Sequence, residues 1–132
     1  MFGPGGHAYV YMCYGIHFLF NVVTNTTGTA DAVLVRALEP HTGIAVMESR
    51  RGKLANRYHL TSGPGKLTRA LGIDRQCNGR SLLDDDVWIS GDNKPLSNSQ
   101  IVASPRIGID YAGEDAALPW RFTIKGNSWV SK

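Results

Sequence analysis

With 132 residues, an apolar fraction of 42% and a net charge of +3, the chain is long enough for one domain with a buried core, and its composition excludes a mainly disordered state. No apolar run is long enough to cross a membrane, the N-terminal residues lack the pattern of a signal peptide, and Cys13 and Cys77 form neither a disulfide framework nor a zinc motif. The small basic excess is compatible with a polyanionic partner without requiring one.

The first third of the chain is predicted to be strand-rich. Aromatic and β-branched residues dominate residues 8–14 and 16–24, and Gly15 between them is typical of a turn, so this stretch predicts a strand, a turn and a second strand. Residues 31–38 predict a third, largely buried strand, which Pro40 stops because proline cannot donate to a sheet.

Two helices are predicted in the middle of the chain. Residues 41–57 have apolar side chains loosely spaced along one side, and Thr42 is positioned to cap the start of this helix. The glycine- and proline-rich residues 62–66 open a second, short helix, which ends at Gly72.

The remaining residues predict strands separated by turns. The acidic run 84–86 is read as an exposed turn that leads into a strand over residues 87–89, and two further strands are predicted over residues 105–109 and 120–124. These elements predict a single α+β domain, residues 1–132, with a mainly antiparallel, curved sheet and short helices.

Several short motifs occur in one chain, each of them weak alone. They are Tyr-Val-Tyr-x-x-Tyr-Gly at 9–15 with Asn21 after it, Leu-Val-Arg-Ala-Leu-Glu-Pro at 34–40, Ser-Gly-Pro-Gly-Lys-Leu at 62–67, Arg-Ile-Gly-Ile at 106–109, Gly-Glu-Asp at 113–115 with Pro-Trp-Arg-Phe at 119–122, and Trp-Val-Ser at 129–131. In this order they resemble the alkyladenine (3-methyladenine) DNA glycosylases over essentially the whole chain. The resemblance implies a fold related to the C-terminal domain of formyltransferases. It also implies a protein that flips damaged purines out of duplex DNA and hydrolyses the N-glycosidic bond without metal or cofactor.

The resemblance assigns roles to three residues of the first motifs. It makes Tyr14 a wedge that enters the DNA stack, and Tyr11 the ring that stacks on the flipped base. It makes Asn21 the amide that excludes guanine, which carries an N2 amino group that adenine lacks. The alternatives that remain open are a solvated tyrosine at a strand end for Tyr14 and an amide that satisfies backbone groups for Asn21.

Further residues are assigned more broadly. The resemblance places His17 and Arg36 beside the flipped nucleotide, although a structural histidine and a buried, paired arginine are the alternatives. Residues 62–66 do not fit a phosphate-binding P-loop, because leucines stand where that motif needs a glycine and a hydroxyl residue. The DNA backbone is expected to meet a set of basic side chains, with a solvated surface as the alternative: Lys66, Arg106 and Arg121.

The glutamate that performs the chemistry in the resembling family is missing from the sequence. It belongs to a Glu-x-Glu-Ala-Tyr motif, which with a further histidine lies upstream of the matched region, and neither occurs among these 132 residues. No catalytic residue is therefore assigned, and Glu39 before Pro40 is read as structural. Three accounts are open: a truncated product or misplaced start, which we favour, a protein that kept lesion binding and lost hydrolysis, or a second polypeptide that supplies the missing part.

The sequence thus predicts a protein of base-excision repair. Its expected partner is double-stranded DNA containing damaged purines, and we expect a monomer with no cofactor, no metal and no membrane contact. The expected location is the cytoplasm, at the nucleoid, or the nucleus in a eukaryote. The alternatives are a non-catalytic module that binds damaged DNA and a sheet domain that binds RNA.

Overall fold

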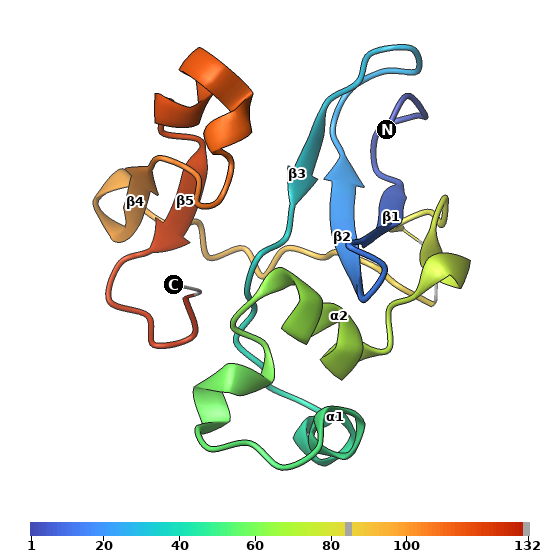
Figure 1. Cartoon of the computed structure of the whole chain (residues 1–132), viewed down its shortest axis with the longest axis vertical. Helices are drawn as coiled ribbons and strands as arrows, with labels where there is room; N and C mark the ends of the chain where they lie inside the picture. Colours follow the sequence, from blue (N-terminus) through green and yellow to red (C-terminus); the bar gives the residue numbers. More distant parts are fainter. Residues whose placement is uncertain (84–85, 131–132) are drawn as a thin grey trace.

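The computed structural model describes residues 1–83 and 86–130 of the chain and confirms the α+β class (Figure 1). The strands divide between two antiparallel sheets, one with the order β1–β2–β3 and one formed by β4 and β5. The strands and α-helices are β1 Ala8–Cys13, β2 His17–Val23, β3 Ala32–Leu34, α1 Ile44–Arg51, α2 Pro64–Leu71, β4 Ile101–Ser104 and β5 Arg121–Ile124. Short 3₁₀ helices lie between them: η1 Arg57–Leu60, η2 Arg75–Cys77, η3 Asn98–Gln100 and η4 Asp110–Ala117.

The β1–β2 hairpin forms as the sequence predicts. Because side chains alternate along a strand, Ala8 and Val10 point into the core while Tyr9 and Tyr11 share the other face. The two tyrosine rings lie with their centroids 5.2 Å apart. The hairpin therefore carries an apolar face toward the protein and an aromatic face away from the core.

A tight turn closes this hairpin at Tyr14 and Gly15. The N–H of Ile16 donates to the carbonyl of Cys13 at 3.2 Å, and the two central residues have φ of 52° and 69°. Positive φ at both central positions is the geometry of a type I′ turn, whose twist suits a hairpin. Glycine adopts it freely, whereas a tyrosine in this region is strained.

The third strand is shorter and more exposed than predicted. β3 pairs with β2 only as far as Leu34, although the N–H of Val35 still donates to Phe20 O at 3.0 Å. Beyond it the backbone turns to Thr61, whose carbonyl accepts from the Leu38 N–H at 3.3 Å. The prediction of a strand over 31–38 is thus wrong beyond the first few residues, because a loop supplies the hydrogen bonds instead of the sheet.

The first helix is also shorter than the predicted 41–57. It begins after Gly43 and ends at Gly52, both with positive φ, and no side chain caps its start, so the capping role predicted for Thr42 is wrong. Because positive φ costs glycine little, the backbone can leave the helical path at Gly52. α2 forms where predicted, with Pro64 in its first turn and Gly72 as its left-handed C-cap.

Helix α2 joins the first sheet to α1 and contributes to the core. Leu67 and Ala70 are completely buried, and the Thr68 hydroxyl donates to Phe18 O of β2 at 2.7 Å. One apolar cluster lies under β1 and β2, and a second, around Met47 and Leu60, lies between α1, η1 and α2. The three-stranded sheet and the helices therefore pack around these two clusters.

Two predictions in the last third are corrected. The strand predicted over 105–109 does not form, because the strand that pairs with β5 lies earlier, at Ile101–Ser104, and Pro105 and Gly108 then turn the chain. No strand forms over residues 87–89. Asp84 and Asp85 of the predicted acidic turn lie outside the described residues, while Asp86 forms an ion pair with Arg80.

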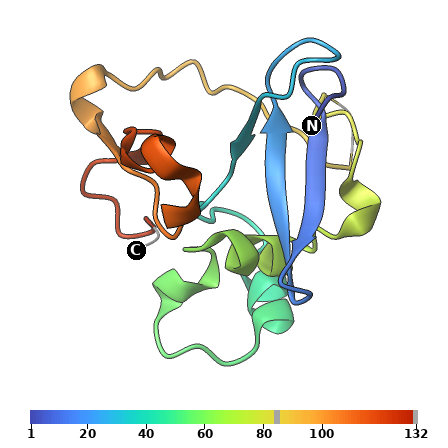
Figure 2. The ribbon, with the colours of Figure 1, turned by 45° about the horizontal axis from the view of Figure 1, so that its top comes forward.

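The β4–β5 hairpin and η4 stand beside the three-stranded sheet rather than extending it (Figures 1 and 2). The chain after β5 reaches back toward the helices, where Asn127 Nδ2 donates to Glu39 Oε2 at 3.1 Å. The ring of Trp129 meets Tyr58 edge-on, with centroids 4.9 Å apart. These contacts hold the second hairpin at one side of the sheet.

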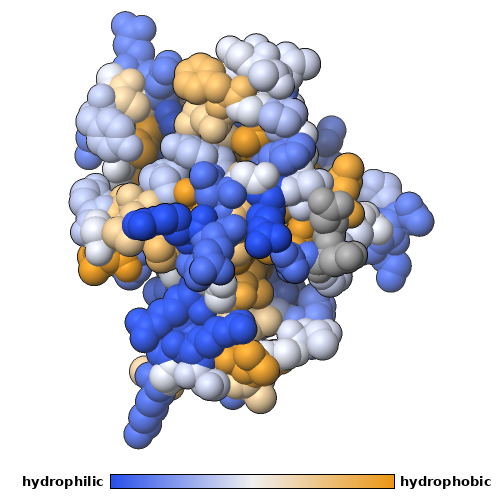
Figure 3. Space-filling model, turned by 90° about the vertical axis from the view of Figure 1, so that its right-hand side faces the viewer, coloured by the Kyte–Doolittle hydropathy of each residue, from blue (hydrophilic) through white to orange (hydrophobic). Residues whose placement is uncertain are grey.

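The opposite side of the molecule, turned toward the viewer in Figure 3, presents hydrophilic side chains across its middle with apolar ones scattered around them. Among the described residues, no helix has the length and hydropathy needed to cross a membrane.

Candidate functional site

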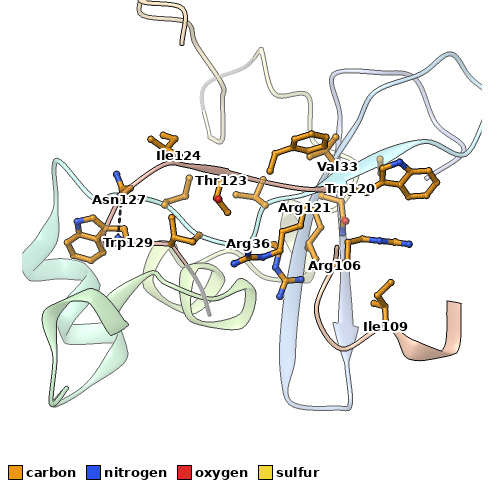
Figure 4. Close-up of a pocket in the computed structure, with 18 of the residues that line it drawn as sticks. Val33, Arg36, Arg106, Ile109, Trp120, Arg121, Thr123, Ile124, Asn127 and Trp129 are labelled. Carbon is orange, nitrogen blue, oxygen red and sulfur yellow. Dashed lines mark hydrogen bonds between the residues drawn. The ribbon is translucent and has the colours of Figure 1, made fainter. Parts of the chain in front are cut away.

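A cleft of about 780 Å³ lies between the three-stranded sheet and the β4–β5 hairpin (Figure 4). This volume suits a ligand of the size of a nucleotide. One wall comes from Tyr11, Asn21 and the segment 32–39, and the other from the segment around η4, from β5 and from the residues that follow it. Tyr11, Asn21 and Arg36, which the sequence assigned to one pocket, thus line one cleft. Arg106 and Arg121, predicted to meet the DNA backbone, also line it.

The cleft contains a concentration of guanidinium groups. Arg36 and Arg121 lie next to each other near its centre (Figure 4). Partial burial lowers the pKa of Arg36, and the charge of Arg121 lowers it further. The Nε of Arg36 is buried and has no hydrogen-bond partner among the described residues. Because a buried guanidinium needs an acceptor, this end of the cleft suits an anionic group.

Arg106 already contacts residues on its own side of the cleft. Its Nη2 donates to Asp115 O at 3.3 Å, and its guanidinium lies 5.1 Å above the ring of Trp120. Glu39 is the one acid among the described residues that line the cleft, and its carboxylate accepts the hydrogen bond from Asn127. The electrostatic balance of the cleft is therefore positive.

Tyr11 presents a neutral ring to the cleft. Partial burial raises the pKa of Tyr11 first, and its neighbours Cys13, Tyr9 and Tyr111 raise it further. The phenol therefore stays protonated at neutral pH, and Tyr9 packs against it from the same strand. An uncharged, electron-rich ring face of this kind binds planar aromatic and cationic groups.

Asn21 has both a structural contact and a place in the cleft. It is buried, and its Nδ2 donates to Tyr9 O of the paired strand at 3.2 Å. This contact is the backbone-satisfying role that the sequence left open, and it also fixes the orientation of the amide. A fixed amide at a cleft wall can discriminate between ligands by shape and by hydrogen bonding.

The remaining predicted residues lie outside the cleft. Tyr14 is at the tip of the β1–β2 hairpin with its side chain 89% exposed, and Lys66 is in the first turn of α2. His17 packs its ring against Gly65 of the same turn, since a methyl group at Gly65 would lie 2.8 Å from the His17 Cγ. These residues form a second group, at the hairpin tip and the start of α2.

We expect Gly65→Ala to lower the free energy of unfolding by about 1–3 kcal/mol, which urea denaturation measures. The added methyl group would overlap the body of the His17 ring rather than the far end of a flexible chain. The His17→Ala background is the control, because it removes the ring. There Gly65→Ala should cost much less, since only the Cβ of residue 17 remains, 3.1 Å from the added methyl group, and alanine favours a helix over glycine by about 1 kcal/mol. An equal loss of stability in both backgrounds would contradict this packing.

The sequence did not predict the aromatic residues on the second wall. Tyr111 and Trp120 line the cleft, but the sequence assigned a role to neither, although Trp120 belongs to the motif at 119–122. No sequence signal identifies Tyr111, because its exposure and its place at the cleft depend on the fold. Among residues 1–83 and 86–130, no group of three or more His, Cys, Asp or Glu side chains is placed to hold a metal ion.

The protein has an α+β fold, and its cleft combines an aromatic ring, a fixed amide and guanidinium groups. These are the functional groups that bind bases and phosphates. The family model described as "Methylpurine-DNA glycosylase (MPG)" matches residues 1–128, and the chain belongs to this family. The family predicted from the motifs is confirmed, and with it membership of the DNA glycosylases of DNA repair.

Relatives from distant organisms are similar to the chain. Proteins named "Putative 3-methyladenine DNA glycosylase" from Carboxydothermus hydrogenoformans and Methanoculleus marisnigri are each 49% identical to it, over 132 and 134 residues. One from Bacillus cereus is 49% identical over 140 residues. The alignments cover 100% of this chain and 67%, 68% and 68% of these relatives, so the chain spans about two thirds of their length.

Proposed function

We propose that the cleft receives a damaged purine that has been rotated out of duplex DNA. The observation that carries the proposal is the meeting of Tyr11, Asn21 and Arg36 at one cleft, from β1, from β2 and from the loop after β3. A base inside a duplex is out of reach of an enzyme, so binding in such a cleft requires flipping. The names of the relatives give the substrate class, a methylated adenine in DNA.

The groups in the cleft suit the two halves of a damaged nucleotide. A purine alkylated at N3 or N7 is positively charged, and the face of the Tyr11 ring attracts such a cation by about 0.5–2 kcal/mol. The phosphates carry the opposite charge and are attracted to the guanidinium of Arg36. The buried Nε of this residue has no hydrogen-bond partner among the described residues. The base would thus stack on the aromatic wall while its anionic part faces the arginines.

We propose that Tyr14 fills the gap left by the flipped base. The turn that carries it projects from the end of the β1–β2 hairpin, and Met12 and Ile16 beside it are also exposed. Apolar side chains pushed between base steps unstack them and kink the duplex. A tyrosine held at positive φ is strained, and such strain gathers at sites where a particular side chain is needed.

We propose hydrolysis of the N-glycosidic bond as the reaction of the family. The cleft residues of this chain are proposed to recognise the lesion. Activation of water needs a free carboxylate near the sugar. Glu39 is the acid that lines the described cleft, and its hydrogen bond to Asn127 favours a structural role. We therefore expect this chain to bind lesions without releasing the base, which is also what the alternative, a non-catalytic damage-binding module, would do.

Tyr14→Gly is expected to weaken binding of a lesion-containing duplex about tenfold while leaving binding of intact duplex nearly unchanged. Glycine suits the positive φ of this position, so the variant removes the wedge without adding backbone strain. Fluorescence anisotropy with a duplex that contains one ethenoadenine measures the change. Tyr58→Phe, outside the hairpin, is the matched control. An equal loss on both duplexes would rule out the wedge.

The remaining parts of the proposal follow from a duplex DNA substrate. On the same basis we propose that the protein acts as a monomer. We also propose that it acts where the DNA is, in the cytoplasm at the nucleoid or in a nucleus. Preference for a lesion in duplex DNA over single-stranded RNA of the same sequence would separate this function from RNA binding.

A further inference from the structure

Three arginines gather where the last turns of α1 and α2 meet, and we call them the arginine cluster: Arg50, Arg51 and Arg69. The Nη1 of Arg50 donates to Ala70 O in the last turn of α2 at 3.0 Å. In return, the Nε of Arg69 donates to Arg50 O in the last turn of α1 at 3.1 Å. Partial burial lowers the pKa of Arg51, and the nearby charge of Arg69 lowers it further. The two helix ends therefore bring three guanidinium groups together.

Capping of the helices explains only part of the cluster. Carbonyl groups at helix C-termini carry partial negative charge and attract basic side chains. Arg51 makes two such contacts, from its Nε to Leu60 O at 3.3 Å and from its Nη2 to His59 O at 3.1 Å. A guanidinium has five N–H donors, and within the described part of the chain Arg50 and Arg69 each use one. Most of the donors thus remain available to a further acceptor.

No carboxylate balances the cluster among the residues that the structure describes. The ion pair found in residues 1–83 and 86–130 joins Arg80 to Asp86, outside both helices. Neighbouring positive charges repel each other, and an anion placed between them removes this cost. Arg50 and Arg69 are exposed, and the planar fork of a guanidinium matches the oxygens of a phosphate. The cluster therefore suits a phosphate group that comes from solvent.

The cluster lies along α2 from the β1–β2 hairpin. Figure 1 places α2 between this hairpin and α1. Lys66, which is predicted to meet the DNA backbone, precedes Arg69 by three residues, so both side chains project from one side of α2 about 4.5 Å apart along its axis. Each strand of B-DNA carries one phosphate for about every 3.4 Å of its axis. Basic side chains along α2 can thus follow successive phosphates away from the hairpin.

We propose that the arginine cluster holds a backbone phosphate of duplex DNA, beyond the contact expected at Lys66. This inference deepens the proposed function, because it takes duplex DNA to be the ligand. None of the three arginines lines the cleft. Phosphate contacts supply affinity and fix the orientation of the protein on the duplex without reading a base. The cluster is thereby an anchor for the backbone and is separate from recognition of the lesion.

The test is the salt dependence of binding to an intact duplex, measured by fluorescence anisotropy. The logarithm of the association constant falls linearly with the logarithm of the salt concentration, by about 0.9 for each phosphate that the protein neutralises. Arg69→Gln is expected to reduce this slope by about 1. Arg69→Lys keeps the charge and should keep the slope. Lys94→Gln is the matched control, because it removes one charge from an exposed side chain outside both helices.

A second variant separates phosphate binding from helix capping. Arg50→Gln removes the other exposed guanidinium of the cluster and should also reduce the slope by about 1. Urea midpoints show which variants remain folded, since each substitution also removes a hydrogen bond to a helix end. A role in capping alone would lower the midpoint and leave the slope of the folded protein unchanged.

The outcomes separate this inference from the proposed function. Arg69→Gln should weaken binding of ethenoadenine and intact duplexes by the same factor, because both contain the same phosphates. An unchanged slope in folded Arg69→Gln and Arg50→Gln proteins would overturn the anchor, as would an equal change in Lys94→Gln, which would show an effect of net charge alone. Weakening confined to the ethenoadenine duplex would overturn it too. A wild-type chain that binds ethenoadenine and adenine duplexes equally, with the expected slopes, would overturn the proposed function and support the anchor.

Discussion

Replacing Tyr11 by alanine is expected to weaken binding of the ethenoadenine duplex by about 1–3 kcal/mol, or roughly 5- to 150-fold. Tyr11 lies on the aromatic face of the hairpin, lines the cleft, and is fixed by Tyr9, so little freedom is lost when a base stacks on it. Because every base offers a ring face, the loss should appear for any flipped lesion. Equilibrium anisotropy titrations at one fixed salt concentration measure it, since salt alone changes DNA affinity.

The Tyr11→Phe variant is the control for this result. It keeps the ring and removes the hydroxyl, so it should bind within about twofold of the wild type if stacking is the cause. Circular dichroism and urea midpoints of both variants show whether the fold is preserved. Unchanged lesion affinity in a folded Tyr11→Ala protein would mean that the base does not stack there.

Leu67→Ala is expected to lower the free energy of unfolding by about 2–5 kcal/mol, the largest effect on stability that we predict. Leu67 is fully buried in α2, which packs on β2 and is bonded to it through Thr68. The truncation removes apolar burial and leaves a cavity that the surrounding side chains fill only partly. Since a small domain has about 5–15 kcal/mol of stability, the variant should unfold at much lower urea.

Leu83→Ala is the matched control, because the same truncation is made at a side chain that is 85% exposed. Its free energy of unfolding should stay within about 0.5 kcal/mol of the wild type. A similar small effect in Leu67→Ala would contradict the packing of α2 on the sheet.

Local patterns predicted the first half of the fold better than the second. The alternation along β1 and β2, with Gly15 between them, defined the hairpin and placed Tyr9 and Tyr11 on one face. Pro64 and Gly72 likewise mark the ends of α2. Each of these features is decided by residues close in sequence.

The wrong predictions of strands lie where contacts between residues far apart in sequence determine the structure. Ile107 and Ile109 alternate as in a strand, but the partner of β5 is the short and exposed β4, whose residues show no alternation of burial. A strand was predicted over 87–89 from residue type, yet no described strand pairs with that segment. Pairing partners set the extent of a strand, and sequence alone does not give them.

The residues of the candidate site, like the elements of the fold, were predicted only in part. The motifs brought Tyr11, Asn21 and Arg36 into one hypothesis, and these residues do line one cleft. The roles assigned to them remain predictions, as do those of His17 in the β1–β2 hairpin and Lys66 at the start of α2. Tyr111 could not be found from sequence, because its place at the cleft depends on how the second hairpin is held beside the first sheet.

One measurement tests the central claim most directly. The chain is titrated against a duplex with one ethenoadenine and against the same duplex with adenine, and release of the base is scored in the same samples. The account predicts tighter binding to the ethenoadenine duplex and no released base. Equal affinity for the two duplexes would contradict recognition of a flipped lesion in the cleft, and released base would show that an acid of this chain activates water.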